Sequence, residues 1–115
     1  METSDTGGPN FNATAVLDFH RQERVVKLKL EGTILGKQVK ALREFLKNVT
    51  EIPGNQWTLQ LDHIDEISLQ GLWVLARFAK EIRRRGHELL VTSIQPELLA
   101  TLRELNLREN FSWKV

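Results

Sequence analysis

Apolar and polar residues alternate near the start of the chain, and this pattern predicts two neighbouring β-strands. The first covers residues 14–20 and the second covers residues 25–30. In the second strand Val26, Leu28 and Leu30 share one face. The opposite face carries lysines, as expected where one side of a sheet meets water. The short polar connection between the two strands favours an antiparallel hairpin.

Apolar residues at helical spacing predict three helices in the rest of the chain. They cover residues 36–50, 69–85 and 96–105. The second helix ends before Gly86, because glycine readily adopts the left-handed backbone that closes a helix. The third begins at Pro96, since proline is favoured in the first helical turn.

The remaining segments predict further strands and the connections between them. Short strands are expected at residues 58–61 and 88–94, with a final one within residues 111–115. The sequence at 31–33 breaks the second strand, and residues 62–68 read as a linker. Strands that alternate with helices predict parallel pairing through right-handed crossovers.

These elements predict a single α/β domain with a small mixed sheet of four to five strands packed with helices. A length of 115 residues fits one domain. Residues 1–12 are mostly small and polar, so we expect a flexible N-terminal tail, with the domain over residues 13–115.

Composition narrows the class of function. The chain has no cysteine, which excludes a disulfide scaffold, a thiolate metal site and a cysteine nucleophile. A net charge of +1 gives no general attraction to nucleic acid. No apolar run approaches the roughly 20 residues that span a bilayer, and no signal-peptide pattern begins the chain. We therefore expect a cytoplasmic protein with no direct membrane insertion and no nucleic-acid partner.

A search for catalytic motifs finds little chemistry. The three histidines are far apart, and no phosphate-binding glycine loop, nucleophile elbow or zinc-protease motif is present. We expect no cofactor, no metal and no enzymatic activity. The alternative is a hydrolase or transferase that uses the carboxylates of Asp62, Asp65 and Glu66, since a carboxylate cluster can bind Mg²⁺ or act in acid–base chemistry. A solvated segment with acids that favour a helix N-terminus explains the same residues more simply.

One tryptophan falls on the polar side of the second predicted helix. At 100° per residue, Leu72, Leu75 and Ala79 share the buried face, whereas Trp73 and Arg77 lie on the opposite side. Trp73 is therefore predicted to be at least partly exposed. Either Arg77 covers the indole through a local cation–π contact, or the pair belongs to a protein interface.

Several segments together resemble the STAS family, whose fold is that of the anti-sigma factor antagonists. Residues 58–91 are similar to the family's central strand–helix–strand pattern. Residues 28–34 resemble an earlier "LxGxL" element, and residues 98–111 resemble the closing "LxxLxLxxxF" segment. Positions that match the family's apolar, glycine and helix-to-strand pattern are Gly32, Ile64, Ile67, Gly71, Leu72 and residues 85–89. The resemblance covers about residues 14–115.

The resemblance implies four or five strands with helices on the sheet, and a regulatory role without catalysis. Many members bind a serine-kinase-type anti-sigma factor and so release a sigma factor. The kinase phosphorylates a Ser or Thr at the start of the central helix, which separates the two proteins. Other members are subunits or regulatory domains of transporters and of stress-sensing complexes.

This chain departs from the family at the phosphorylation motif. The family's Asp-Ser-Ser-Gly is here Ser68-Leu69-Gln70-Gly71, so the usual phosphoacceptor position holds Leu69, which has no hydroxyl. Gln60 and Leu35 stand where many members have aspartate. Ser68 is predicted to cap the helix, with the alternative that it is a displaced phosphoacceptor.

The resemblance and the helix pattern together favour a bacterial regulatory protein-binding module, active in transcription control or stress signalling, that lacks the usual serine phosphoswitch. Its expected partner is an anti-sigma factor or a related serine-kinase-type regulator. The alternative is a small STAS subunit of an ABC-type membrane transporter that docks on the ATPase. The predicted partner-binding residues are Thr33, Leu35, Ser68, Leu69, Gln70, Trp73 and Arg77. We expect a monomer or a weak homodimer.

Overall fold

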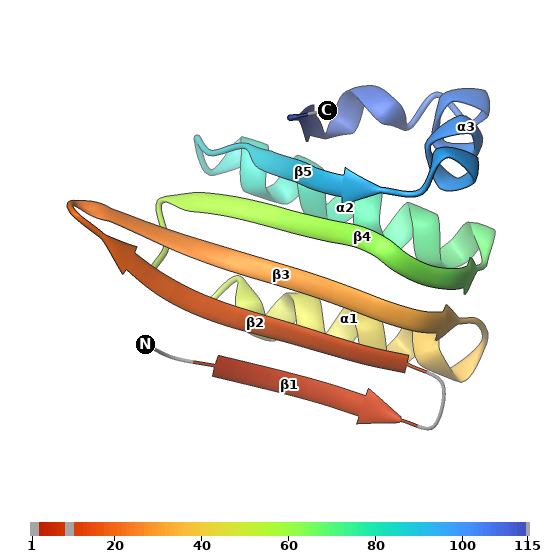
Figure 1. The fold of residues 1–115 in the computed structure, drawn as a ribbon, viewed down its shortest axis with the longest axis horizontal. Helices are drawn as coiled ribbons and strands as arrows, with labels where there is room; N and C mark the ends of the chain where they lie inside the picture. The colour runs from red at the N-terminus through yellow and green to blue at the C-terminus, as the bar shows by residue number, and fades with distance from the viewer. Residues whose placement is uncertain (1–2, 9–10, 115) are drawn as a thin grey trace.

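The computed structural model describes residues 3–8 and 11–114, with side chains from residue 11 onward, and its strands form one six-stranded sheet. The strands lie side by side in chain order (Figure 1). They are β1 (Thr3–Gly8), β2 (Phe11–His20), β3 (Glu23–Ile34), β4 (Gln56–Ile67), β5 (Leu89–Ile94) and β6 (Ser112–Trp113). The helices are α1 (Lys37–Val49), α2 (Leu69–Arg84), α3 (Pro96–Glu104) and the short 3₁₀ helix η1 (Arg108–Asn110).

The sheet is mixed, as the sequence predicts. β1, β2 and β3 pair antiparallel, whereas β3, β4, β5 and β6 pair parallel. α1 and α2 connect successive parallel strands and lie behind the sheet on one face (Figure 1). The α/β architecture is therefore confirmed.

The hydrophobic core lies between this face and the helices. The buried residues of β2 alternate with half-buried ones, and the register places Ala15 opposite Leu28 and Leu17 opposite Val26. Leu75 and Ile82 of α2 are almost fully buried and belong to the same core cluster as these strand residues. The alternation predicted for the hairpin is therefore confirmed. Burial of this kind stabilises a fold by about 25 cal/mol per Å² of apolar surface.

The strand count and the N-terminal tail differ from the expectation. The sheet has six strands, one more than the four to five expected, because β1 is added at the edge beside β2. β6 is the expected terminal strand, reduced to two residues. β1 lies within the segment expected to be a flexible tail, and its backbone pairs antiparallel with β2. Pairing with an existing strand orders small polar residues that carry no pattern of their own.

The expected break at residues 31–33 and linker at 62–68 are wrong, because both segments continue strands as far as Ile34 and Ile67. The register between β3 and β4 shifts on either side of Gly32, so the two strands pair through irregularities. Gly32 has φ 91°, a left-handed conformation that glycine adopts without strain. These irregularities interrupt the period-2 pattern that local sequence would otherwise display.

The helix boundaries agree closely with the prediction. α2 ends at Arg84, and Gly86 follows with φ 88°. The amide of His87 donates to the carbonyl of Ile82 at 3.1 Å, and that of Gly86 donates to Arg83 at 2.9 Å. This pair of hydrogen bonds is a Schellman motif, so the predicted glycine cap is confirmed. Pro96 opens α3, also as predicted.

Candidate functional site

The start of α2 is fixed to the ends of the two central strands. Ile34 and Ile67 are paired at the last positions of β3 and β4. The amide of Ser68 donates to the carbonyl of Ile34 at 3.0 Å. Gly71 allows the helix to approach this point, because a Cβ there would lie 2.8 Å from Ile67 Cγ1 and 3.3 Å from Ile34 Cγ2. A larger residue at position 71 would require the Ile67 side chain or the helix to shift.

Ser68 is the N-cap of α2, as predicted. Its backbone is extended (φ −74°, ψ 163°), and its hydroxyl accepts a hydrogen bond from the amide of Gly71 at 3.1 Å. The hydroxyl thus satisfies one of the free amides in the first turn. Its alternative role as a displaced phosphoacceptor stays a prediction.

Two large apolar side chains project into solvent from the first turns of α2. Leu69 is 53% exposed and Trp73 is 50% exposed. Residues four apart lie on the same side of a helix, so these two side chains are neighbours. Among the side chains described, only Phe19 is a further large hydrophobic residue with comparable exposure. We call Leu69 and Trp73 the apolar pair.

Arg77 follows Trp73 by one turn, but the structure gives no cation–π contact between them. In the described residues the one such contact is Arg108 over the Trp113 ring, at 5.4 Å from the centroid. Arg77 lines a groove between α1 and α2 instead. The structure therefore does not support the local explanation, in which Arg77 covers the exposed indole of Trp73.

The structure brings most of the predicted binding residues to one end of the sheet. Thr33 pairs with Glu66 near the ends of β3 and β4, and Glu66 lies two residues before Ser68 in the chain. Leu35 follows β3 and its amide donates to Gln38 Oε1 at 3.3 Å. Gln70 is exposed beside Leu69 in the first turn of α2. Arg77, two turns from the helix start, lies furthest from this group.

The acidic residues considered for catalysis lie on the last part of β4. Ser93 Oγ donates to Asp62 Oδ1 at 3.0 Å, and Gln95 Nε2 donates to the Asp62 carbonyl at 2.9 Å. Desolvation raises the pKa of Asp62, but hydrogen bonds from the Gln60 and Ser93 side chains outweigh it, so the pKa lies below its ordinary value. An aspartate held ionised by its neighbours suits a structural contact between β4 and β5 better than general acid catalysis.

Asp65 and Glu66 are exposed and do not complete a metal site with Asp62. In residues 3–8 and 11–114, no group of three His, Asp or Glu side chains is placed to hold a metal ion. No helix in the same residues is both long and apolar enough to cross a bilayer.

Sequence reasoning missed the groove between α1 and α2. It has a volume of about 270 Å³. Its lining residues are Arg43, Leu46, Lys47, Thr50, Val74, Arg77, Phe78, Glu81 and Arg85. The helical spacing of the basic residues on each helix was visible in the sequence. What the sequence did not reveal was that the two helix faces lie next to each other, since this depends on how the crossovers pack.

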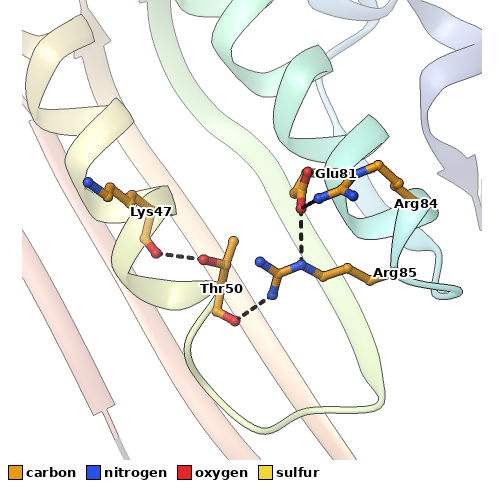
Figure 2. A network of polar contacts seen from close by, with 5 residues as sticks. All are labelled: Lys47, Thr50, Glu81, Arg84 and Arg85. Atoms are coloured by element: carbon orange, nitrogen blue, oxygen red, sulfur yellow. Dashed lines mark hydrogen bonds and ion pairs between the residues drawn. The ribbon is translucent and has the colours of Figure 1, made fainter.

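A polar network joins the two helices at their C-terminal ends (Figure 2). Arg85 donates from Nη1 to the carbonyl of Thr50 at 3.0 Å and from Nε to Glu81 Oε2 at 3.1 Å. Arg84 donates to both carboxylate oxygens of Glu81, at 3.0 and 2.6 Å. Hydrogen bonds from Arg84 and then from Arg85 hold the pKa of Glu81 below its ordinary value.

The family model for the STAS domain matches residues 17–115. An anti-sigma factor antagonist from Mycobacterium paratuberculosis has a similar structure, with a TM-score of 0.70 at 17% identity over 88% of this chain and 84% of that one. An uncharacterised protein with a SpoIIAA-like fold from Shewanella loihica has a TM-score of 0.59 at 9% identity, over 95% of this chain and 89% of that one. A search of curated proteins returns no significant match. The two structural likenesses establish a shared fold.

Proposed function

The chain belongs to the STAS domain family, and from this premise we propose that it is a non-enzymatic regulatory module that binds a partner protein in the manner of an anti-sigma factor antagonist. The observation that carries the proposal is the apolar pair, Leu69 and Trp73, exposed at the start of α2. The likeness to an anti-sigma factor antagonist supports the class of partner. That partner is an anti-sigma factor or a related serine-kinase-type regulator.

The apolar pair has the character of an interface centre. A tryptophan side chain offers about 150–250 Å² of surface for burial, and half of this one is already open to solvent. Tryptophan is enriched among residues whose loss costs about 2 kcal/mol or more of binding free energy. We assign Thr33, Leu35, Ser68 and Gln70 to the margin of this surface, because they lie near the ends of β3 and β4 and in the first turn of α2. Arg77 is the most distant assigned residue and also lines the groove between α1 and α2.

We further propose that binding is not controlled by phosphorylation at position 69. Leu69 has no hydroxyl, and the neighbouring Ser68 hydroxyl is engaged as the helix cap at 3.1 Å from the Gly71 amide. The absence of a phosphoacceptor keeps the surface permanently in a binding form. A Leu69→Ser variant would restore the missing hydroxyl.

The test is an affinity capture from lysate of the source cells, followed by a binding titration with the purified captured protein. The baits are the wild-type chain, Leu69→Asp, Trp73→Ala and Phe19→Asp as a matched control, since Phe19 is equally exposed on the β2–β3 hairpin. We expect a kinase-type regulator with the wild type and with Phe19→Asp. Leu69→Asp should weaken binding by about 30-fold or more, the loss typical of a central interface residue.

Equal binding by wild type and Leu69→Asp would contradict the proposed surface. Capture of a transporter ATPase would favour the alternative, a small subunit of an ABC-type transporter. The proposed class of partner would then be wrong, but the proposed binding surface would stand. Incubation with the captured kinase and ATP tests the missing switch. We expect phosphate transfer to Leu69→Ser and none to position 69 of the wild type, and transfer to wild-type Ser68 would overturn this part.

A further inference from the structure

The groove between α1 and α2 has an apolar floor that lies apart from the apolar pair. Leu46 of α1 and Phe78 of α2 are buried at its base, and Val74 is half-buried beside them. Phe78 is held from below by Trp57, with ring centroids 6.1 Å apart in an edge-to-face arrangement. The floor is therefore part of the folded core and keeps its shape without a ligand.

The rim of the groove carries an excess of positive charge. Arg43 and Lys47 on α1 and Arg77 and Arg85 on α2 are all exposed at its edge. The single acid among the lining residues, Glu81, is already bound by Arg84 and Arg85. Within the part of the chain that the structure describes, no carboxylate pairs with Arg43, Lys47 or Arg77. The rim thus offers unneutralised cations on both sides of an apolar floor.

The shape of the groove suits a helix. Its lining residues recur on each helix at spacings of three and four, so each helix contributes one continuous face. On α2 this face runs from Val74 to Arg85, about 16 Å at 1.5 Å per residue. Arg85 and Thr50 both line the groove, and the Arg85 guanidinium donates to the Thr50 carbonyl between the C-terminal ends of the two helices (Figure 2). A guest of about three helical turns would fill this length.

We propose that this groove binds an acidic amphipathic helix of a partner protein, at a second surface that contains neither Leu69 nor Trp73 and adjoins the first surface at Arg77. The apolar face of the guest packs on Leu46, Val74 and Phe78, and its flanking carboxylates meet Arg43 and Lys47 on one side and Arg77 on the other. Helix-in-groove recognition uses apolar anchors at these spacings. Charge complementarity at the rim sets which helix is accepted and how fast it associates.

The test uses two synthetic amphipathic peptides with the same leucine face. One carries glutamates on its flanks and the other carries lysines at the same positions. Binding to ¹⁵N-labelled protein is followed by amide chemical shifts and by fluorescence anisotropy. The informative variant is Arg43→Glu with Lys47→Glu. Its matched control is Lys37→Glu with Lys40→Glu, which makes the same charge change at exposed positions of α1 outside the groove.

We expect the acidic peptide to shift the amides around Leu46, Val74 and Phe78 and the basic peptide to bind at least about tenfold more weakly. The groove reversal should weaken the acidic peptide by about tenfold or more, and the control reversal by less than about threefold. Leu69→Asp should leave this binding unchanged, so failure of the apolar pair as a site and failure of the groove are separate results.

Equal affinity for both peptides, or shifts confined to Leu69 and Trp73, would overturn the proposal. So would saturation of the groove by dodecanoate with no peptide binding, which would assign it to a small anionic amphiphile. Shifts that depend on protein concentration without peptide, and that vanish in the groove reversal, would assign the groove to a second copy of this chain.

Discussion

The two halves of α2 have different solvent-exposed faces but similar buried faces. The first eight residues of the helix, 69–76, carry no charged side chain, and two large apolar residues project from them into solvent. The last eight, 77–84, carry four cations and one anion. Yet Leu72, Leu75, Ala79 and Ile82 are buried alike along the whole length. The fold constrains the inner face, so the difference between the halves belongs to the outer face, where we propose that partners bind.

The largest expected effects test whether the inner faces are equivalent. Leu75→Ala in the first half and Ile82→Ala in the second should each lower the free energy of unfolding by about 2–5 kcal/mol, because both side chains are almost fully buried and leave a cavity. Urea denaturation followed by circular dichroism measures both. Trp73→Ala and Arg77→Ala serve as outer-face controls and should each change stability by about 0.5 kcal/mol or less.

If Trp73→Ala lowered the free energy of unfolding by more than about 2 kcal/mol, the comparison between inner and outer faces would be wrong. The exposed indole would then be shown to stabilise the fold. The apolar pair would then have a structural explanation, and its use as a binding surface would lose its main support.

Intermediate effects are expected at the two ends of the helix, which are capped by different means. Ser68→Ala removes the hydroxyl bound to the Gly71 amide and should cost about 1 kcal/mol. Gly86→Ala places a Cβ at φ 88° and should cost about 1–2 kcal/mol. Thermal or urea unfolding measures both losses.

Each end has a conservative replacement as its control. Ser68→Asp keeps an acceptor at the N-cap and should recover most of the loss. Gly86→Asn should be milder than Gly86→Ala, because asparagine tolerates the left-handed region better. Equal losses for the conservative and the alanine variants would show that capping is not the cause.

The smallest effect concerns the charges of the second half. The pKa of Glu81 lies below its ordinary value because Arg84, and then Arg85, donate hydrogen bonds to its carboxylate. A group with a lowered pKa in the folded chain stabilises the fold above its unfolded pKa. That contribution disappears as the pH falls through the folded pKa. Carboxyl ¹³C shifts titrated from pH 7 to pH 2 should show a midpoint below that of a free glutamate.

Arg84→Gln should move this midpoint towards the ordinary value, with a smaller movement for Arg85→Gln. Lys80→Gln, a neighbouring exposed cation outside the network, is the control and should move it least. A wild-type midpoint at the ordinary glutamate value would contradict the lowering of the Glu81 pKa by Arg84 and Arg85.

The outer face of α2 was predictable because a helix has a regular period. The position of Trp73 opposite Leu72 and Leu75 follows from 100° per residue, and the structure confirms its exposure. Ser68 and Gly86 were predictable as caps because their chemistry acts within one turn. Local rules of this kind need no knowledge of the tertiary structure.

Features that depend on pairing between distant segments were not predictable. Residues 62–67 extend β4 only because the end of β3 lies beside them, across the irregular register at Gly32. β1 is ordered by its pairing with β2. The α1–α2 groove requires two helix faces, separated by more than twenty residues, to lie side by side. In each case the deciding neighbour is remote in sequence.

The fit of Gly71 against Ile67 and Ile34 has a kinetic consequence. The start of α2 packs closely against the ends of the central strands, so we expect a partner to meet the apolar pair in the geometry that it keeps in the complex. Association would then need only diffusion and correct orientation, with a rate constant of about 10⁵–10⁷ M⁻¹s⁻¹. Partners would then differ mainly in the dissociation rate constant of the complex. A regulator that competes for this surface could bind only after the first partner had dissociated.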